Sequence, residues 1–151
     1  MTVLDLAKRW AEPPHILLVE DDDSVRSLML RALRRYDCEV HEASSVAAAT
    51  RWIFLRKFDL VFLDLGLPDG SGVEVIKLLK QEAPATPVIV VTGGLDWEAA
   101  HDALREGVVT VLLKPFDIAE LKRSLDMFKL RTIPRCEVSF SSTVTATATA
   151  G

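Results

Sequence analysis

Polar side chains of complementary chemistry follow four apolar runs of this sequence. The acidic group Glu20 to Asp23 follows the first run, Asp64 follows a second, Thr92 a third and Lys114 a fourth. Carboxylates brought together from these positions would repel one another by about 4 kcal/mol per pair at roughly 4 Å and an effective dielectric of about 20. That repulsion requires a cation, and an all-oxygen ligand set suits Mg²⁺.

A magnesium ion in such a cluster could also serve phosphoryl transfer. It can neutralise a transferring phosphoryl group while an ionised aspartate acts as the nucleophile. Thr92 would add a hydroxyl and Lys114 an ammonium to the electrostatic surroundings. The four polar groups therefore indicate phosphoryl chemistry on an aspartate.

Strands and helices must position these groups. The sequence alternates short apolar runs with segments in which apolar residues recur at helical spacing. This alternation is typical of βα units on a parallel sheet, where ligands bind beyond the carboxyl ends of the strands. We therefore predict a doubly wound, flavodoxin-like α/β fold, a three-layer (βα)5 sandwich with a five-stranded parallel sheet. The predicted strands cover residues 16–19, 38–41, 58–63, 88–91 and 108–113.

Helices are predicted between and after these strands, from apolar positions three or four residues apart. The helix over residues 96–106 has a thin apolar face made of Trp97, Ala100, Ala103 and Leu104, and residues 67–70 have turn chemistry. Side chains suited to capping precede the other helices. The predicted caps are Asp22 or Asp23, Ser44 or Ser45, Ser71 paired with Glu74, and Asp117 paired with Glu120.

Length and composition favour one soluble, cytoplasmic domain. The 151 residues carry 18 Lys and Arg against 22 Asp and Glu, a net charge of −4, and 49% are hydrophobic. This balance disfavours a basic nucleic-acid binder and a disordered chain. No apolar run approaches the roughly 20 residues that span a bilayer, and residues 1–12 do not resemble a signal peptide.

The division of the chain follows from the same patterns. We expect an N-terminal extension over residues 1–14, one domain over 15–131 and a C-terminal tail over 132–151 that is a flexible extension, an added strand or a remnant of expression. Cys38 and Cys136 lie far apart and form no C-x-x-C pair, so neither a disulfide framework nor a zinc site is indicated. The three histidines are scattered, and we expect no ligand role for them.

Four motifs, in this order, resemble the receiver domain of bacterial two-component response regulators over about residues 15–130. They are ILLVEDD at 16–22, LDLGLPDGSG at 63–72, VTG at 91–93 and LKPF at 113–116. In that family an acidic pair lies six residues before an Arg of the first helix, which here selects Glu20 and Asp21 ahead of Arg26. Asp22 and Asp23 fall outside the pair.

The resemblance implies a role for each matching residue. Asp64 would be the phosphoacceptor, Thr92 would bind a phosphoryl oxygen and Lys114 would pair with the phosphate. Mg²⁺ would be held by Asp21, Asp64 and the backbone carbonyl of Gly66, and by Glu20 through water.

The implied activity is acceptance of a phosphoryl group from a phosphohistidine of a sensor histidine kinase or a histidine phosphotransfer protein. The resulting acyl phosphate shifts a conformational equilibrium that a downstream protein or output domain reads. Such a chain is a signalling domain rather than an enzyme, promoting only its own phosphorylation and dephosphorylation. Family members use the fourth helix, fifth strand and fifth helix for partners, and this surface could also form a homodimer. No direct contact with nucleic acid or membrane is expected.

The sequence departs from the family pattern at the switch. Val111 stands three residues before Lys114, where the family usually has an aromatic side chain that swings inward as the threonine moves. Two positions that tune hydrolysis of the phosphate are both glycine, Gly66 and Gly94. The valine puts the aromatic half of the switch in doubt, although Val111 could still repack against a displaced Thr92.

Other functions were weighed against this one. Hydrolases of the haloacid dehalogenase type need a second Asp as general acid where Gly66 stands, and a flavin or mononucleotide binder needs a Gly-rich turn after the first strand. Two alternatives stay open: a receiver-like interaction module that works without phosphorylation, which Val111 favours, and the N-terminal receiver fragment of a DNA-binding transcriptional regulator. Neither flank of the domain is long enough for an output domain.

Overall fold

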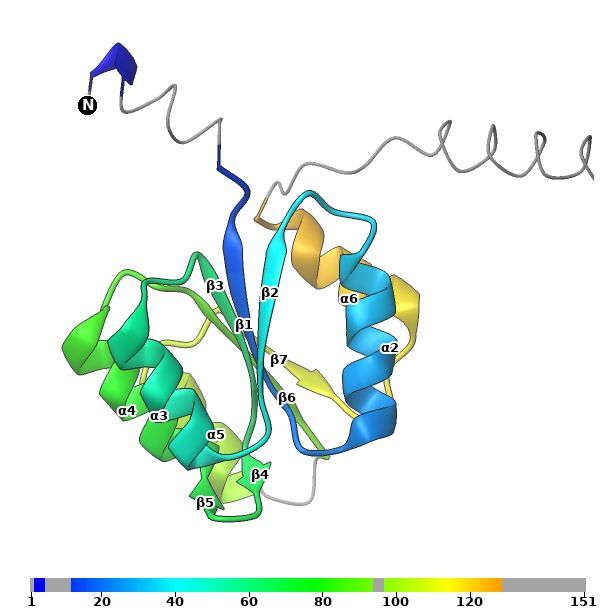
Figure 1. Cartoon of the computed structure of the whole chain (residues 1–151). Helices are drawn as coiled ribbons and strands as arrows, with labels where there is room; N and C mark the ends of the chain where they lie inside the picture. The colour runs from blue at the N-terminus through cyan, green and yellow to red at the C-terminus, as the bar shows by residue number, and fades with distance from the viewer. Residues whose placement is uncertain (1, 5–11, 94–96, 129–151) are drawn as a thin grey trace, which may run out of the picture.

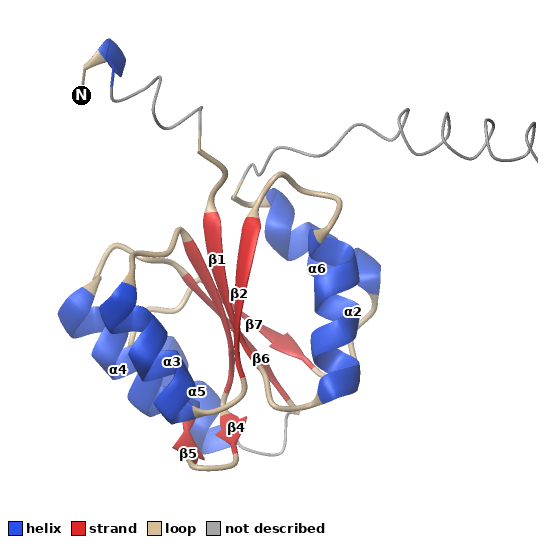
Figure 2. Cartoon of the chain, viewed as in Figure 1, coloured by secondary structure: helices blue, strands red, loops and turns tan. Residues whose placement is uncertain are grey.

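A computed structural model describes residues 2–4, 12–93 and 97–128 of the chain. The predicted tail, Gly94, Asp96 and Cys136 lie outside the described residues. A five-stranded parallel sheet forms the middle of three layers, with helices on both of its faces (Figure 2). The flavodoxin-like sandwich predicted from the alternating pattern is therefore confirmed. Within the described residues, no helix has both the length and the apolarity needed to cross a bilayer.

The strand order places the ends of four strands beside one another. The strands are β1 (His15–Val19), β2 (Glu39–Ala43), β3 (Leu60–Asp64), β6 (Val88–Thr92) and β7 (Thr110–Leu113), in the order β2-β1-β3-β6-β7. The runs in β1, β3 and β6 are apolar and buried almost throughout, as strands covered on both faces should be. The carboxyl ends of β1, β3, β6 and β7 therefore meet at one edge of the sheet.

The helices divide into two groups (Figure 1). Two pack on one face of the sheet, α2 (Asp23–Leu33) and α6 (Ile118–Asp126), and three on the other, α3 (Val46–Leu55), α4 (Gly72–Glu82) and α5 (Trp97–Arg105). Alternate strand residues point to opposite faces. Each face has its own apolar core, with Phe62 in one core and Leu63 in the other.

Most predicted helix caps are confirmed. Asp22 accepts hydrogen bonds from the Ser24 and Val25 amides, Ser45 accepts one from Ala48, and Asp117 and Glu120 form the predicted capping box. At α4 the cap is confirmed but its pairing differs, because the Ser71 hydroxyl accepts from Val73 instead of forming the predicted box with Glu74.

Strand boundaries shift by one to two residues from the prediction. The second strand begins at Glu39 instead of 38, the third at Leu60 instead of 58, and the last at Thr110 instead of 108. Val108 is buried, but its amide donates to the Ala103 carbonyl at the end of α5. The apolar side chain of Val108 is therefore buried, but its backbone amide bonds to helix α5 rather than to the sheet.

The prediction for the apolar face of α5 is half wrong. Ala100 and Ala103 are buried as expected, together with Ala99, but Trp97 is 73% exposed and Leu104 53% exposed. Three alanines face the rest of the protein, and the two large apolar side chains point outward. Helix α5 therefore presents an apolar surface to solvent.

Candidate functional site

Three carboxylates meet at the carboxyl ends of β1 and β3. Val19 pairs with Leu63 in the parallel ladder, so Glu20 and Asp64 follow at adjacent strand ends. One ligand atom each from Glu20, Asp21 and Asp64 lies within 4.8 Å of the others. Glu20 is 1% exposed and Asp64 6%, whereas Asp21 is open to solvent. The arrangement predicted for these acids is therefore present in the structure.

Lys114 reaches this cluster from the end of β7. Its Nζ lies 2.6 Å from Glu20 Oε1 and 3.1 Å from Asp64 Oδ2, and its amide donates a 2.8 Å hydrogen bond to the Thr92 carbonyl. Burial alone would lower the pKa of Lys114, but its contacts with Glu20 and Asp64 outweigh burial and raise that pKa above its ordinary value. The ammonium therefore stays charged between two carboxylates.

One ammonium does not balance this cluster. With all three acids ionised, the four side chains carry a net charge of about −2. Burial, followed by the neighbouring Asp64, raises the pKa of Glu20 to about 7 against the opposing effect of Lys114. Glu20 Oε1 is buried and lies against the Lys114 ammonium, so the one cation found in this cluster among the described residues is shared by two carboxylates. An acidic, all-oxygen cluster with this excess of negative charge fits a hard divalent cation.

Backbone geometry holds the segment after Asp64 against the carboxylate. The Gly66 amide donates to Asp64 Oδ1 at 3.0 Å, and the Gly72 amide donates to the Leu65 carbonyl at 2.8 Å. A Cβ on Gly72 would collide with the Asp64 carbonyl oxygen and lie 2.9 Å from the Leu65 Cα. Glycine is therefore required at position 72, which its place in the sequence does not reveal.

Asp69 connects the same segment to helix α3 through hydrogen bonds. A short antiparallel pair, β4 (Gly66–Leu67) and β5 (Gly70–Ser71), surrounds the predicted turn. From this turn the Asp69 carboxylate accepts hydrogen bonds from the Val46 and Ala47 amides, at 2.7 and 3.0 Å. These bonds, that of Ala47 first, lower the pKa of Asp69. Asp69 and Ala47 are 22 residues apart in the sequence, so local sequence patterns could not predict this contact.

Arg26 contacts the backbone of the acidic pair, a role that its spacing in the sequence did not predict. Its guanidinium donates to the Glu20 carbonyl at 3.0 Å, forms an ion pair with Glu42 at 3.1 Å and contacts Asp23. Asp22 caps α2, and Asp23 pairs with Arg26. Asp22 and Asp23 therefore make their contacts outside the carboxylate cluster, which agrees with their exclusion from the acidic pair.

Thr92 closes β6 beside the cluster. The preceding residue, Val91, pairs with Asp64, and Thr92 itself is 3% exposed and pairs with Leu113 of β7. The structure thus brings all four predicted groups, Glu20 with Asp21, Asp64, Thr92 and Lys114, to one edge of the sheet.

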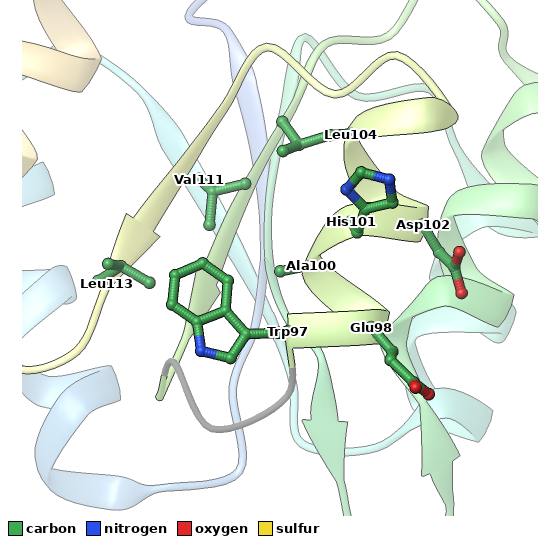
Figure 3. A pocket seen from close by; sticks show the side chains of 8 residues that line it. All are labelled: Trp97, Glu98, Ala100, His101, Asp102, Leu104, Val111 and Leu113. Atoms are coloured by element: carbon green, nitrogen blue, oxygen red, sulfur yellow. The ribbon is translucent and has the colours of Figure 1, made fainter.

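An apolar groove of about 610 Å³ lies between α5 and β7. Its lining includes Trp97, Ala100 and Leu104 from the helix and Val111 and Leu113 from the strand (Figure 3). Val111, which stands where the resemblance leads one to expect an aromatic residue, is half-buried in this groove. The indole of Trp97 supplies an aromatic ring on the same lining from a different element.

Comparison with known proteins defines the class. The sequence matches the response regulator receiver domain over residues 16–126, most of the chain. Together with the fold and the strand-end cluster, this match shows that the chain belongs to the family of response regulator receiver domains, the signalling domains of two-component systems.

Particular relatives carry the same domain. The KDP operon transcriptional regulatory protein KdpE of Escherichia coli is 39% identical over 111 residues, which cover 74% of this chain and 49% of KdpE. Response regulator protein PilR of Pseudomonas aeruginosa is 33% identical over 106 residues, 70% of this chain and 24% of PilR. This chain thus spans a quarter to a half of these relatives.

A solved structure shows the same fold. The signal receiver domain of a putative Luxo repressor protein from Vibrio parahaemolyticus superposes with a TM-score of 0.71 at 29% identity, over 77% of this chain and 89% of that one. The predicted family and fold are confirmed.

Proposed function

We propose that Asp64 accepts a phosphoryl group from the phosphohistidine of a sensor histidine kinase or a histidine phosphotransfer protein, in a Mg²⁺-dependent reaction. The observation that supports this proposal is the buried pair of Glu20 and Asp64, which share the ammonium of Lys114 beside Asp21 at the strand ends and keep an excess of negative charge. Phosphorylation would then act through contacts with another protein.

The proposed ligands of the ion are the carboxylates of Asp21 and Asp64, the carbonyl of Gly66, and Glu20 through water. Their net negative charge and their all-oxygen chemistry support this assignment. When bound, Mg²⁺ neutralises part of the charge on the phosphoryl oxygens. Asp21 is exposed, so a cation and a phosphodonor can reach the cluster from solvent.

The proposed reaction uses three side chains. A carboxylate oxygen of Asp64 attacks phosphorus, the P–N bond breaks, and its electron pair passes to the imidazole of the donor, which takes up a proton. Lys114, already 3.1 Å from Asp64, pairs with a phosphoryl oxygen, and the Thr92 hydroxyl donates to another. Gly66 keeps the Asp64 carboxylate oriented through its amide.

The output would pass through the surface that includes the apolar groove. Thr92 pairs with Leu113, and Val111 lies two residues earlier on the same strand, so a displacement of Thr92 reaches the groove lining. We propose that α5, β7 and α6 contact a downstream protein, an output domain or a second copy of the chain. A net charge of −4 favours a protein partner over nucleic acid. The proposed receiver unit is residues 15–131, in the cytoplasm.

The test is incubation of the chain with a small acyl phosphate and Mg²⁺, followed by intact-mass measurement. We expect one added phosphoryl group on the wild type and on Asp37→Asn, an exposed aspartate outside the cluster, and none on Asp64→Asn. Asp21→Ala should abolish the dependence on Mg²⁺. Absence of the increment would overturn the assignment and favour a module that works without phosphorylation. Its survival in Asp64→Asn would overturn the assignment by placing the phosphoryl group on another residue.

A further inference from the structure

Two histidines and a glutamate meet at the other end of the sheet, where β1 and β2 begin. His15 is in register with Glu39, and His41 lies two residues after Glu39 on the same strand. Residues two apart on a strand share a face, so the three side chains lie on one side of the sheet. This cluster was not predictable from local sequence, because 23 residues separate His15 from Glu39.

The ligand atoms of this cluster are spaced as in a metal site. His15 Nδ1 lies 3.1 Å from His41 Nε2, one Glu39 oxygen lies 3.6 Å from His15 Nδ1, and the other lies 3.5 Å from His41 Nε2. Around a tetrahedral zinc ion with bonds of about 2.0–2.1 Å, neighbouring ligand atoms are roughly 3.3 Å apart. The two nitrogens are therefore close to the separation of neighbouring ligand atoms around such an ion, and one Glu39 oxygen lies within 4.8 Å of both.

The surroundings hold the imidazoles and leave the carboxylate open. The side chains of His15 and His41 are 17% and 11% exposed, whereas that of Glu39 is 53% exposed. The His41 ring packs edge-on against Trp52 and Phe58, with ring centroids 4.7 and 5.5 Å away. Ring orientation is thus set by packing, and Glu39 provides the side from which an ion can enter.

We infer that His15 Nδ1, His41 Nε2 and a Glu39 carboxylate oxygen form a binding site for a zinc-class transition-metal ion, with water in the fourth position. Imidazole nitrogen suits Zn²⁺ and its neighbours, whereas the all-oxygen cluster around Asp64 suits Mg²⁺. The chain would then carry two cation sites of different selectivity at opposite ends of β1. Zinc would tie the edge strand β2 to β1, because each strand supplies a ligand.

Nearby charges leave this site net negative. Besides Glu39, the carboxylate of Asp59 accepts a 2.8 Å hydrogen bond from the His15 amide, and Arg56 is the cation whose charge acts on His41. Both imidazoles must be neutral to bind a metal, and burial, followed by Arg56, lowers the pKa of His41. The alternative is that His15, Glu39 and His41 bind only one another, through hydrogen bonds and ion pairs. The experiment below distinguishes this triad from a metal site.

The experiment is calorimetric titration of the metal-free full chain with Zn²⁺, with Mg²⁺ present in excess to occupy the carboxylate cluster. We expect one zinc ion per chain. His15→Gln, Glu39→Gln and His41→Gln should each weaken binding at least tenfold, since even the loss of an outer hydrogen-bond partner weakens metal binding by about 10–100-fold. His101→Gln, an exposed histidine on α5, and Asp64→Asn are the matched controls and should bind as the wild type does.

A second measurement on the wild type avoids reliance on variants that fold poorly. Zinc should shift the ring NMR signals of His15 and His41 and leave those of His101 unchanged. Zinc binding that survives His15→Gln and His41→Gln, or that disappears in Asp64→Asn, would overturn the proposal. An absence of binding with unshifted His15 and His41 signals would overturn it too, and would identify the cluster as a hydrogen-bonded triad.

Discussion

Lys114 provides the positive charge in the carboxylate cluster of Glu20, Asp21 and Asp64. Its ammonium is in contact with two buried carboxylates, and no other ion pair of Glu20 or Asp64 is found among the described residues. Removing one partner of a buried ion pair leaves uncompensated charge, which costs more than the pair itself contributes. The same ammonium is the proposed partner of the phosphate, so it serves the cluster before and after phosphorylation.

Replacing Lys114 should therefore destabilise the chain. We expect Lys114→Ala to lower the free energy of unfolding by about 3 kcal/mol in the absence of divalent cations, and Mg²⁺ to restore part of the loss. Urea unfolding at pH 7.5, with and without Mg²⁺, measures both effects. Lys77→Ala, an exposed lysine on α4, is the control and should change stability by less than about 0.5 kcal/mol. Equal effects of the two substitutions would contradict this account.

Glu20 should give the stability a distinctive pH dependence. The folded chain raises the pKa of Glu20 from 4.5 to about 7, so between these values the folded state binds more protons than the unfolded state. The free energy of unfolding should then fall as pH rises from about 4.5 to 7, by up to about 3 kcal/mol from this group.

Denaturant titrations in EDTA across this pH range measure the slope. Glu20→Gln should flatten it and should be more stable than the wild type at pH 8, because the buried charge is gone. A wild-type stability that instead rises with pH, unchanged in Glu20→Gln, would show that Glu20 titrates normally.

At the scale of elements, the segment from β3 to α4 depends on close backbone contact. The Gly72 amide donates to the Leu65 carbonyl, and the Gly72 Cα lies against the Asp64 backbone with no room for a side chain. Asp69 fastens the turn between β4 and β5 to the start of α3. The segment that follows Asp64 is therefore held at two points, at Gly72 by close backbone contact and at Asp69 by hydrogen bonds to α3. Both contacts help to position Asp64.

A methyl group at position 72 should displace this segment. We expect Gly72→Ala to lower the free energy of unfolding by about 1–3 kcal/mol and to slow phosphorylation by the acyl phosphate. Gly93→Ala is the matched control, because a Cβ there meets no atom within 4 Å. Thermal unfolding and the rate of mass increase measure the two effects. Equal behaviour of the two variants would show that the close approach at Gly72 is not needed.

At the scale of the whole molecule, the carboxylate cluster and the apolar groove are linked through two strands. Asp64 pairs with Val91 in the ladder, Val90 of the same strand β6 pairs with Val111, and Val111 lines the groove beside Trp97. A shift of Thr92 on phosphorylation would therefore alter the surroundings of the Trp97 indole.

Trp97 fluorescence should report phosphorylation. We expect the emission of the wild type to change when the acyl phosphate and Mg²⁺ are added, and Asp64→Asn to show no change. Trp97→Phe should lose the change and Trp52→Phe should keep it, because Trp52 lies on α3, away from the groove. The same spectral change in Asp64→Asn would break the proposed link.

The fold was predictable from the sequence because its signals are local. Apolar runs give the strands, helical spacing and caps such as Asp22 and Asp117 give the helices, and one parallel sheet follows from their alternation. The strand-end acids, Thr92 and Lys114 were predictable because parallel strands end at the same edge. Contacts set by packing were not: the closeness of Gly72 to Asp64, the bridge from Asp69 to α3 and the outward position of Trp97 depend on how elements approach one another.

The hydrogen bond from the Lys114 amide to the Thr92 carbonyl has a mechanical consequence. The two residues proposed to contact the phosphate sit on different strands, yet their backbones are joined at those strand ends. If Thr92 moved toward a phosphate on Asp64, this bond would carry the displacement to the turn at Lys114 and Pro115, which leads into α6. The proposed phosphorylated state would then alter the start of α6 as well as the groove beside α5.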